Sequence, residues 1–188
     1  MKKRIVYIVS YFLLLLTLFV CQKPFFMLYN DAAEKGALFS DFFRVMGNGI
    51  SLDATTAGYL TALPFLMVLI SIWVKKFPLR KILLPYYIIA SLLVAVVFVV
   101  DMGLYPFWGF KLDASIFLYL DSPKEAMASV SFGFILLRVV AMLMLTTFYV
   151  WLMCKVTPHQ LEVTAKRIGG TLGMLFLGGI LFIIIRGG

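Results

Sequence analysis

The sequence predicts an all-α integral membrane protein with five transmembrane helices. Of its 188 residues, 63% are hydrophobic and 14% are charged, and the mean hydropathy is +1.02. Soluble globular chains are about half apolar and a quarter charged. The apolar residues form runs of about 18 to 24, the length at which a helix crosses a hydrocarbon core of about 30 Å. Composition and run length together exclude a soluble domain.

The first apolar run, residues 5–28, is expected to be a membrane span. Lys2, Lys3 and Arg4 precede it and Cys21 lies within it, so the start of the chain resembles a secretory signal. A lipoprotein cysteine follows a small residue, however, and here Val20 precedes Cys21. We therefore interpret the run as an uncleaved span, with Lys23 near its outer end reaching the headgroups.

Residues 30–49 predict a short helix that lies on the membrane surface. Apolar side chains recur there at helical spacing: Leu38, Phe39, Phe42, Phe43 and Met46. A phenylalanine-rich helix of this length is more typical of the interface than of a crossing.

The second and third spans are expected at residues 54–74 and 82–100. Asp53 is placed to cap the start of the second span. Pro64 lies inside that span, where neighbouring helices can tolerate a kink, and Pro85 falls in the first turn of the third.

Residues 104–130 are neither a clean span nor an ordinary polar loop, because aromatic residues such as Tyr105 and Trp108 alternate with charged residues such as Lys111 and Asp113. Such a mixture is typical of a surface along one face of the bilayer. Ser122 and Pro123 predict the start of a helix that continues through the fourth span, residues 126–153. The fifth span is expected at residues 168–185.

The distribution of charge predicts the orientation. The amino terminus and two of the loops hold ten basic residues and one acid, whereas the other two loops hold four basic residues and eight acids. Lys and Arg concentrate on the cytoplasmic side. The amino terminus is therefore expected inside, and the aromatic loops and the carboxyl terminus outside. In a soluble protein a net charge of +8 would suggest nucleic acid, but here it reports orientation, so no nucleic-acid partner is expected.

Arg138 is the sharpest candidate site residue, because it lies inside the fourth span. An ionisable group at that depth is costly unless it is paired or hydrated. Two interpretations stay open. Arg138 binds an anionic lipid headgroup, or it forms a structural pair with Asp101 or Asp53.

The sequence offers no metal or catalytic motif. Asp53, Asp101 and Asp113 all fall on the outer side, but their spacing matches no ligand set. His159 stands alone in a polar loop and is expected to be solvated. No nucleophile and base, and no glycine-rich phosphate loop, are recognisable.

Gly169 and Gly173 form a small-xxx-small pair in the fifth span. Such pairs allow close helix contact. Packing within one chain is the favoured interpretation, and a homo-oligomer is left open.

Two segments carry a resemblance to a known family. The first joins Phe43-Arg44 and Asn48-Gly-Ile-Ser-Leu-Asp53 to Ala57-Gly-Tyr-Leu-Thr-Ala-Leu-Pro64. The second joins Leu104-Tyr-Pro-Phe-Trp-Gly-Phe-Lys-Leu-Asp113 to Ser122-Pro-Lys-Glu-Ala-Met-Ala-Ser129. With the five-span layout, they resemble the membrane domain of the bacterial lipoteichoic-acid-synthase-like, sulfatase-fold phosphoglycerol transferases.

The resemblance implies a domain in the bacterial cytoplasmic membrane. In that family a sulfatase-like domain with a threonine nucleophile and a divalent metal follows the last span and moves phosphoglycerol or related headgroups from a phospholipid. The chain ends where the linker to that domain is expected, so no residue here inherits the nucleophile or metal roles, and the chain alone is expected to show no turnover.

The sequence therefore predicts a five-helix anchor that presents lipid donor to a catalytic domain in cis, with membrane lipids as its partners and no cofactor of its own. Lys111, Arg44 and Arg138 are the residues expected to meet lipid phosphate. The alternatives are a small transporter or channel subunit, and a membrane scaffold that binds proteins through Phe39, Phe42 and Trp108.

Overall fold

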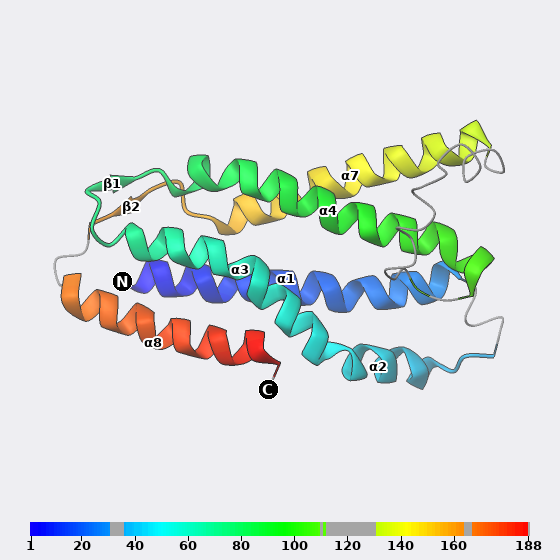
Figure 1. The fold of residues 1–188 in the computed structure, drawn as a ribbon, viewed down its shortest axis with the longest axis horizontal. Helices are drawn as coiled ribbons and strands as arrows, with labels where there is room; N and C mark the ends of the chain where they lie inside the picture. Colours follow the sequence, from blue (N-terminus) through cyan, green and yellow to red (C-terminus); the bar gives the residue numbers. More distant parts are fainter. Residues whose placement is uncertain (31–35, 110, 112–130, 164–166, 188) are drawn as a thin grey trace.

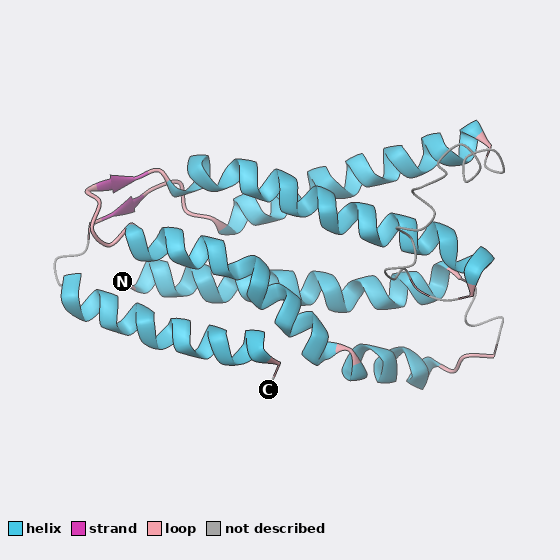
Figure 2. Ribbon diagram, viewed as in Figure 1, coloured by secondary structure: helices cyan, strands magenta, loops and turns pink. Residues whose placement is uncertain are grey.

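The computed structural model describes residues 1–30, 36–109, 111, 131–163 and 167–187. Almost all of these residues are helical (Figure 2). The helices are α1 (Lys2–Tyr29), α2 (Phe39–Asn48), α3 (Ile50–Ile70), α4 (Leu79–Trp108), α7 (Phe132–Val156) and α8 (Arg167–Arg186), and two short strands are β1 (Lys76–Phe77) and β2 (Leu161–Glu162). Apart from α2, each of these helices is long and apolar enough to cross a membrane. The prediction is therefore confirmed as far as the number, length and apolar composition of the five helices are concerned.

The five long helices lie along one axis and alternate in direction (Figure 1). Helices α1 and α3 pack together in the middle, α4 pairs with α7 on one side, and α8 packs on α3. Contacts of Arg4 with Ser71 and Glu162 join the amino terminus, the α3–α4 turn and the α7–α8 connection at one end. We call this the amino-terminal end. The Thr55 hydroxyl donates to the Ile184 carbonyl at 3.3 Å, which places the end of α8 toward the opposite end.

The amino-terminal end is closed around a buried arginine. The Arg4 side chain is 4% exposed. Its Nε donates to Ser71 Oγ at 3.0 Å, and its Nη2 donates to the carbonyls of Ser71 and Glu162 at 2.9 and 2.6 Å. Because the Ser71 hydroxyl also donates to the Val68 carbonyl, the side chain competes with the helix and α3 stops at Ile70.

Below Arg4, tyrosines from α1 and α4 form the core. The Tyr7 hydroxyl lies 2.7 Å from that of Tyr87, which in turn lies 2.7 Å from the hydroxyl of Thr157. Tyr11 is fully buried, stacks on Tyr87 with ring centroids 5.6 Å apart, and donates to the Met153 sulfur. Buried hydroxyls are costly unless they find partners, and this chain satisfies them across three helices.

Strands β1 and β2 tie the two turns of this end into an antiparallel ladder, with Phe77 opposite Leu161. Arg80 extends the tie, because its guanidinium donates to the Cys154 carbonyl and lies 2.9 Å from His159 Nε2. His159 is exposed, as expected of a solvated residue, but it has this arginine as a partner. Neither strand was predicted, since two-residue strands leave no periodic pattern.

Helix α8 approaches α3 closely at Gly58 and Gly178. The sequence had indicated Gly169 and Gly173 instead. A Cβ at Gly178 would lie 2.8 Å from the Phe65 ring, and one at Gly58 would lie 2.8 Å from Ile185. Among the described residues, nothing lies within 4 Å of a Cβ built at Gly169 or Gly173. Packing of that pair within the chain is therefore a wrong prediction.

Three predicted helix boundaries also need correction. Helix α3 begins and ends four residues earlier than predicted. Helix α4 continues to Trp108, past Pro106, and ends at Gly109, whose φ of 72° is left-handed. The first residues of the aromatic stretch are therefore the last turn of α4.

The fourth long helix, α7, starts at Phe132, and Ser131 before it is extended with ψ of 146°. The Ser131 hydroxyl accepts a bond from the Phe134 amide at 3.3 Å, so this serine caps the helix. The prediction of a single helix from Pro123 to Met153 is therefore wrong, because Ser131 is extended and α7 begins only after it. The predicted start at Ser122 lies outside the described residues.

Helix α2 has the amphipathic character that the sequence predicted, but it begins at Phe39 and residues 36–38 before it are not helical, so the predicted start at residue 30 is wrong. Phe39 and Phe43 pack edge to face with centroids 5.2 Å apart, and both are exposed on the bundle surface. The Asp41 carboxylate accepts a bond from the Leu38 amide at 2.9 Å and so starts the helix. Gly49 alone separates α2 from α3, so the direction of one helix constrains the other.

Candidate functional site

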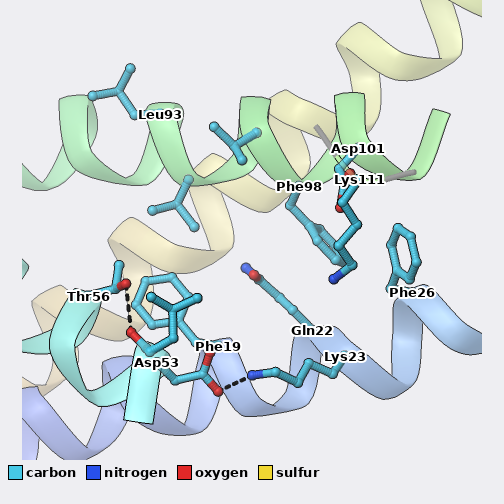
Figure 3. Close-up of a pocket in the computed structure, with 13 residues that line it drawn as sticks. Phe19, Gln22, Lys23, Phe26, Asp53, Thr56, Leu93, Phe98, Asp101 and Lys111 are labelled. Atoms are coloured by element: carbon cyan, nitrogen blue, oxygen red, sulfur yellow. Dashed lines mark hydrogen bonds and ion pairs between the residues drawn. The ribbon is translucent and has the colours of Figure 1, made fainter. Parts of the chain in front are cut away.

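A cavity of about 440 Å³ lies between α1, α3 and α4, toward the end of the bundle opposite the amino terminus (Figure 3). Helix α1 contributes Phe19, Gln22, Lys23 and Phe26, helix α3 contributes Leu52, Asp53 and Thr56, helix α4 contributes Leu93, Val94, Val97, Phe98 and Asp101, and Lys111 follows α4. Ligand sites in proteins have volumes of about 300–1,000 Å³ and are mostly apolar with a few polar groups. This cavity has that size and that composition.

One wall of the cavity carries an ion pair between Lys23 and Asp53. The two side chains are only 15% and 11% exposed. Asp53 was predicted to cap α3, but it lies inside the first turn of the helix and binds Lys23 instead. Lys23 was predicted to reach the headgroups, and that prediction is likewise corrected by this contact across the bundle.

Gly49 fixes the position of the Lys23 ammonium. A Cβ built at Gly49 would collide with the end of the Lys23 side chain. The absence of a side chain at this junction therefore leaves the space in which Lys23 reaches Asp53.

Lys111 contributes the second cation of the cavity. Its Nζ lies 4.5 Å from the centroid of the Phe26 ring, and Phe26 in turn packs edge to face on Tyr105 with centroids 4.9 Å apart. The left-handed Gly109 reverses the chain after α4, which brings Lys111 back toward α1. A cation over a ring is held in place without being neutralised.

The remaining polar side chains of the lining have different hydrogen-bond partners. Gln22 donates to the Tyr149 hydroxyl at 3.0 Å, and Thr56 donates to the Leu52 carbonyl at 2.9 Å. Asp101 supplies a second carboxylate to the lining, from α4. The described lining of the cavity therefore carries charged side chains of both signs.

The cavity reaches the side of the bundle. Leu52, Leu93 and Val97 line it, and they are 73%, 62% and 54% exposed on the bundle surface. In a bilayer such side chains contact lipid, so an acyl chain can reach the cavity without leaving the hydrocarbon. Charged walls beside an apolar side opening suit an amphiphile.

Arg138 lies outside the cavity lining, between α7, the end of α1 and α4. Its Nη2 donates to the Tyr29 hydroxyl, and its guanidinium carbon lies 5.1 and 4.6 Å from the ring centroids of Tyr29 and Phe134. A Cβ at Gly103 would lie 3.2 Å from Arg138 Nε, so α4 and α7 meet closely here. The expected alternative partner Asp53 is bound to Lys23. Arg138 is thus held by aromatic groups at a helix contact.

The other predicted site residues do not join the cavity. Arg44 is on α2, where its exposed side chain lies 3.7 Å from Asp41. Trp108 is the last residue of α4. Asp113 lies outside the described residues. Of the candidates named from the sequence, the structure brings together Asp53 and Lys111.

Within the described ranges, no group of three or more His, Cys, Asp or Glu side chains is placed to hold a metal ion. Sequence reasoning missed Lys23 and Gln22 as site residues. The sequence did contain a pattern that could have indicated Lys23: a lysine lies inside one apolar run and an aspartate lies at the start of the next. Ionisable residues in membrane spans commonly pair with one another. No family model matches the chain, and no curated protein or solved structure is similar enough to count as a match.

Proposed function

We propose that this chain is a membrane domain that anchors a phosphoglycerol- or phosphoethanolamine-type transferase and presents its lipid donor. The observation that carries the proposal is the cavity between α1, α3 and α4, which combines cations, carboxylates and a lateral apolar opening. A phospholipid has the same division into a charged headgroup and an apolar chain. The resemblance described from the sequence supplies the class of reaction.

The charge distribution supports an orientation with the cavity toward the outside. Lys2, Lys3, Arg4, Lys75, Lys76, Arg80, Lys81, Lys155 and Arg167 all belong to the amino-terminal end or its turns. Cytoplasmic loops are enriched in such residues. In this orientation the cavity opens toward the outer leaflet of a bacterial cytoplasmic membrane, and α2 lies in the outer interface with Phe39 and Phe43 in contact with lipid.

Within this function, Lys111 is the residue that meets the lipid phosphate, and Lys23 and Asp53 form the opposite wall. Arg138 and Arg44, which the sequence also suggested for phosphate, take other roles. Arg138 joins α1 to α7 through Tyr29, and Arg44 lies on the exposed face of α2.

The proposal is tested by phospholipid binding to the purified chain in detergent micelles, measured by native mass spectrometry with short-chain phospholipids. We expect retention of one lipid and a weakening of about tenfold in Lys111→Gln, since a charge-assisted contact contributes about 1.5 kcal/mol. Lys155→Gln is the matched control, because Lys155 also stands over an aromatic ring, Trp151 at 3.8 Å, but at the other end. Equal binding by both variants and the parent chain would contradict the proposal.

One observation favours a transporter as the second candidate. The Lys23–Asp53 pair is a charge pair inside the bundle, and intramembrane charges commonly mark substrate paths. If the chain is a transporter, sealed proteoliposomes that contain it should take up a labelled solute, and the uptake should depend on this pair. Loss of such uptake in Asp53→Asn would favour this function, whereas lipid binding without uptake would favour the anchor.

A further inference from the structure

We infer that Asp53 determines which class of phospholipid the cavity accepts. By compensating the charge of Lys23, it disfavours lipids whose phosphate is a monoester, such as phosphatidic acid, relative to lipids whose phosphate is a diester. The inference rests on the proposed function, because it specifies the headgroup chemistry of the lipid that the cavity holds. It follows from the contacts and the burial of one ion pair.

Lys23 and Asp53 belong to the cavity lining and form an ion pair with each other (Figure 3). Both side chains are largely buried. Lys23 lies six residues before the end of α1 at Tyr29, about 9 Å along the helix axis, and Asp53 lies in the first turn of α3. The pair is therefore inside the bundle, where its charges are screened less by water than those of exposed residues.

A phosphate that enters the cavity meets the field of this pair and not that of an isolated lysine. The Asp53 carboxylate lies in direct contact with the Lys23 ammonium, so it offsets the attraction that the ammonium exerts. Apolar side chains such as Phe19 and Val97 line the same cavity and leave the repulsion between carboxylate and phosphate poorly screened. Each further negative charge on the headgroup therefore adds to the repulsion by Asp53.

The two classes of phospholipid differ in the charge of their phosphate. A phosphate diester carries one negative charge, whereas a phosphate monoester has a second pKa of about 6 and carries close to two near pH 8. The repulsion between Asp53 and a monoester is therefore about twice that with a diester in the same position. Removal of the Asp53 charge changes the ratio of the two affinities by the difference, whatever the other charges around the cavity are.

This discrimination suits the proposed donor. The phosphate diester of a phospholipid joins the glycerol backbone to a headgroup alcohol, and a transferase of the proposed type moves that phosphate together with the alcohol. Phosphatidic acid has no headgroup alcohol to move. A carboxylate that disfavours the monoester therefore keeps a lipid that cannot react from occupying the cavity.

The experiment is a competition between short-chain phosphatidylglycerol and short-chain phosphatidic acid for the purified chain in detergent near pH 8, measured by native mass spectrometry. In Asp53→Asn, the ratio of phosphatidic acid to phosphatidylglycerol bound is expected to rise about tenfold above that of the parent chain. Lys23→Gln leaves the Asp53 carboxylate uncompensated, so the ratio is expected to fall. The double variant removes both charges and is expected to return to within about twofold of the parent ratio.

Two further variants are the controls. Asp53→Glu keeps the charge and is expected to keep the parent ratio, and Asp41→Asn removes a carboxylate of α2 that is not part of the cavity lining. A purely structural role of the ion pair would weaken the binding of both lipids together and would not shift the ratio in opposite directions. Because each ratio is measured within one preparation, partial unfolding lowers both signals and leaves the ratio interpretable. If Asp53→Asn does not fold, Lys23→Gln carries the test.

The outcomes separate this inference from the proposed function. A ratio that Asp53→Asn leaves unchanged, or a shift in the same direction in Asp53→Asn and Lys23→Gln, overturns the inference. The proposed function still stands in that case if Lys111→Gln weakens phosphatidylglycerol binding. If the parent chain retains neither lipid, both fail.

Discussion

The two ends of the bundle use charged and polar residues for opposite purposes. At the amino-terminal end, Arg4 and the tyrosine hydroxyls are buried, and they find partners on neighbouring elements at ordinary hydrogen-bond distances. At the other end, Lys23, Asp53 and Lys111 line a cavity of about 440 Å³. Similar residue types thus close one end and line a cavity toward the other.

The difference comes from the acceptors. Among the described acceptors of Arg4 are two backbone carbonyls, which the α3–α4 turn and strand β2 hold in place. The lysines of the cavity face a flexible carboxylate and an aromatic ring, which do not fill the space around them. Backbone acceptors fix a structure, whereas side-chain partners can exchange for a ligand. Substitutions at the two ends should therefore affect different properties.

The largest expected effect is the loss of stability on Arg4→Leu. The substitution leaves the carbonyls of Ser71 and Glu162 without this donor, and three bonds from a charged group together contribute about 3 kcal/mol or more. The measurement is the free energy of unfolding in detergent micelles. Lys3→Ala, an exposed cation at the same end, is the control, and an equal effect of both would remove the distinction between the ends.

Gly178→Leu is expected to destabilise the contact between α8 and α3 by about 2 kcal/mol, because the new side chain collides with the Phe65 ring. Gly173→Leu adds the same side chain on the same helix, where nothing among the described residues lies within 4 Å. It should leave the stability of the monomer unchanged. The two unfolding curves are compared directly, and a larger loss in Gly173→Leu would place α8 in a different rotation.

Tyr87→Phe is expected to cost about 1 kcal/mol, because it removes the hydroxyl that joins Tyr7 to Thr157 and keeps the ring that stacks on Tyr11. Tyr59→Phe, on an exposed ring of α3, is the control. Unfolding that is indifferent to both substitutions would show that the hydroxyl chain adds nothing to the core.

Asp53→Asn is expected to cost less stability than Arg4→Leu, because asparagine keeps a carbonyl oxygen that can accept a hydrogen bond from the Lys23 ammonium. Its effect should appear in lipid binding, since an uncompensated Lys23 changes the charge of the cavity. A loss of stability as large as that of Arg4→Leu would mean that this end is held by its charges as firmly as the other.

The number of spans and their approximate positions followed from hydropathy alone, because the length of an apolar run is a local property. Helix ends did not follow, since tertiary contacts set them. The Ser71 carbonyl is an acceptor for Arg4, and Gly109 ends α4 well after the apolar run has become aromatic. The continuous helix predicted through Ser131 failed because a serine that bonds its own helix start favours a break.

The site was predictable only in part. Lys111 and Asp53 were named from the sequence, and the structure places both at the cavity. Lys23 was taken for a headgroup contact, because the sequence alone does not show that its span faces Asp53. For Arg138 the sequence left open a lipid headgroup and a pair with Asp101 or Asp53, and its described partners are Tyr29 and Phe134. The aromatic partners of a cation cannot be recognised from this sequence, because 16% of its residues are aromatic and many rings could serve.

The contacts of Arg4 also order events during synthesis. The residue emerges among the first, whereas one of its acceptors, the carbonyl of Glu162, is made 158 positions later. Until Ser71 is made, 67 positions after Arg4, none of these acceptors exists, so the guanidinium stays with water and headgroups on its own side of the bilayer. The same arginine thus guides insertion first and is enclosed only when the nascent protein is nearly finished.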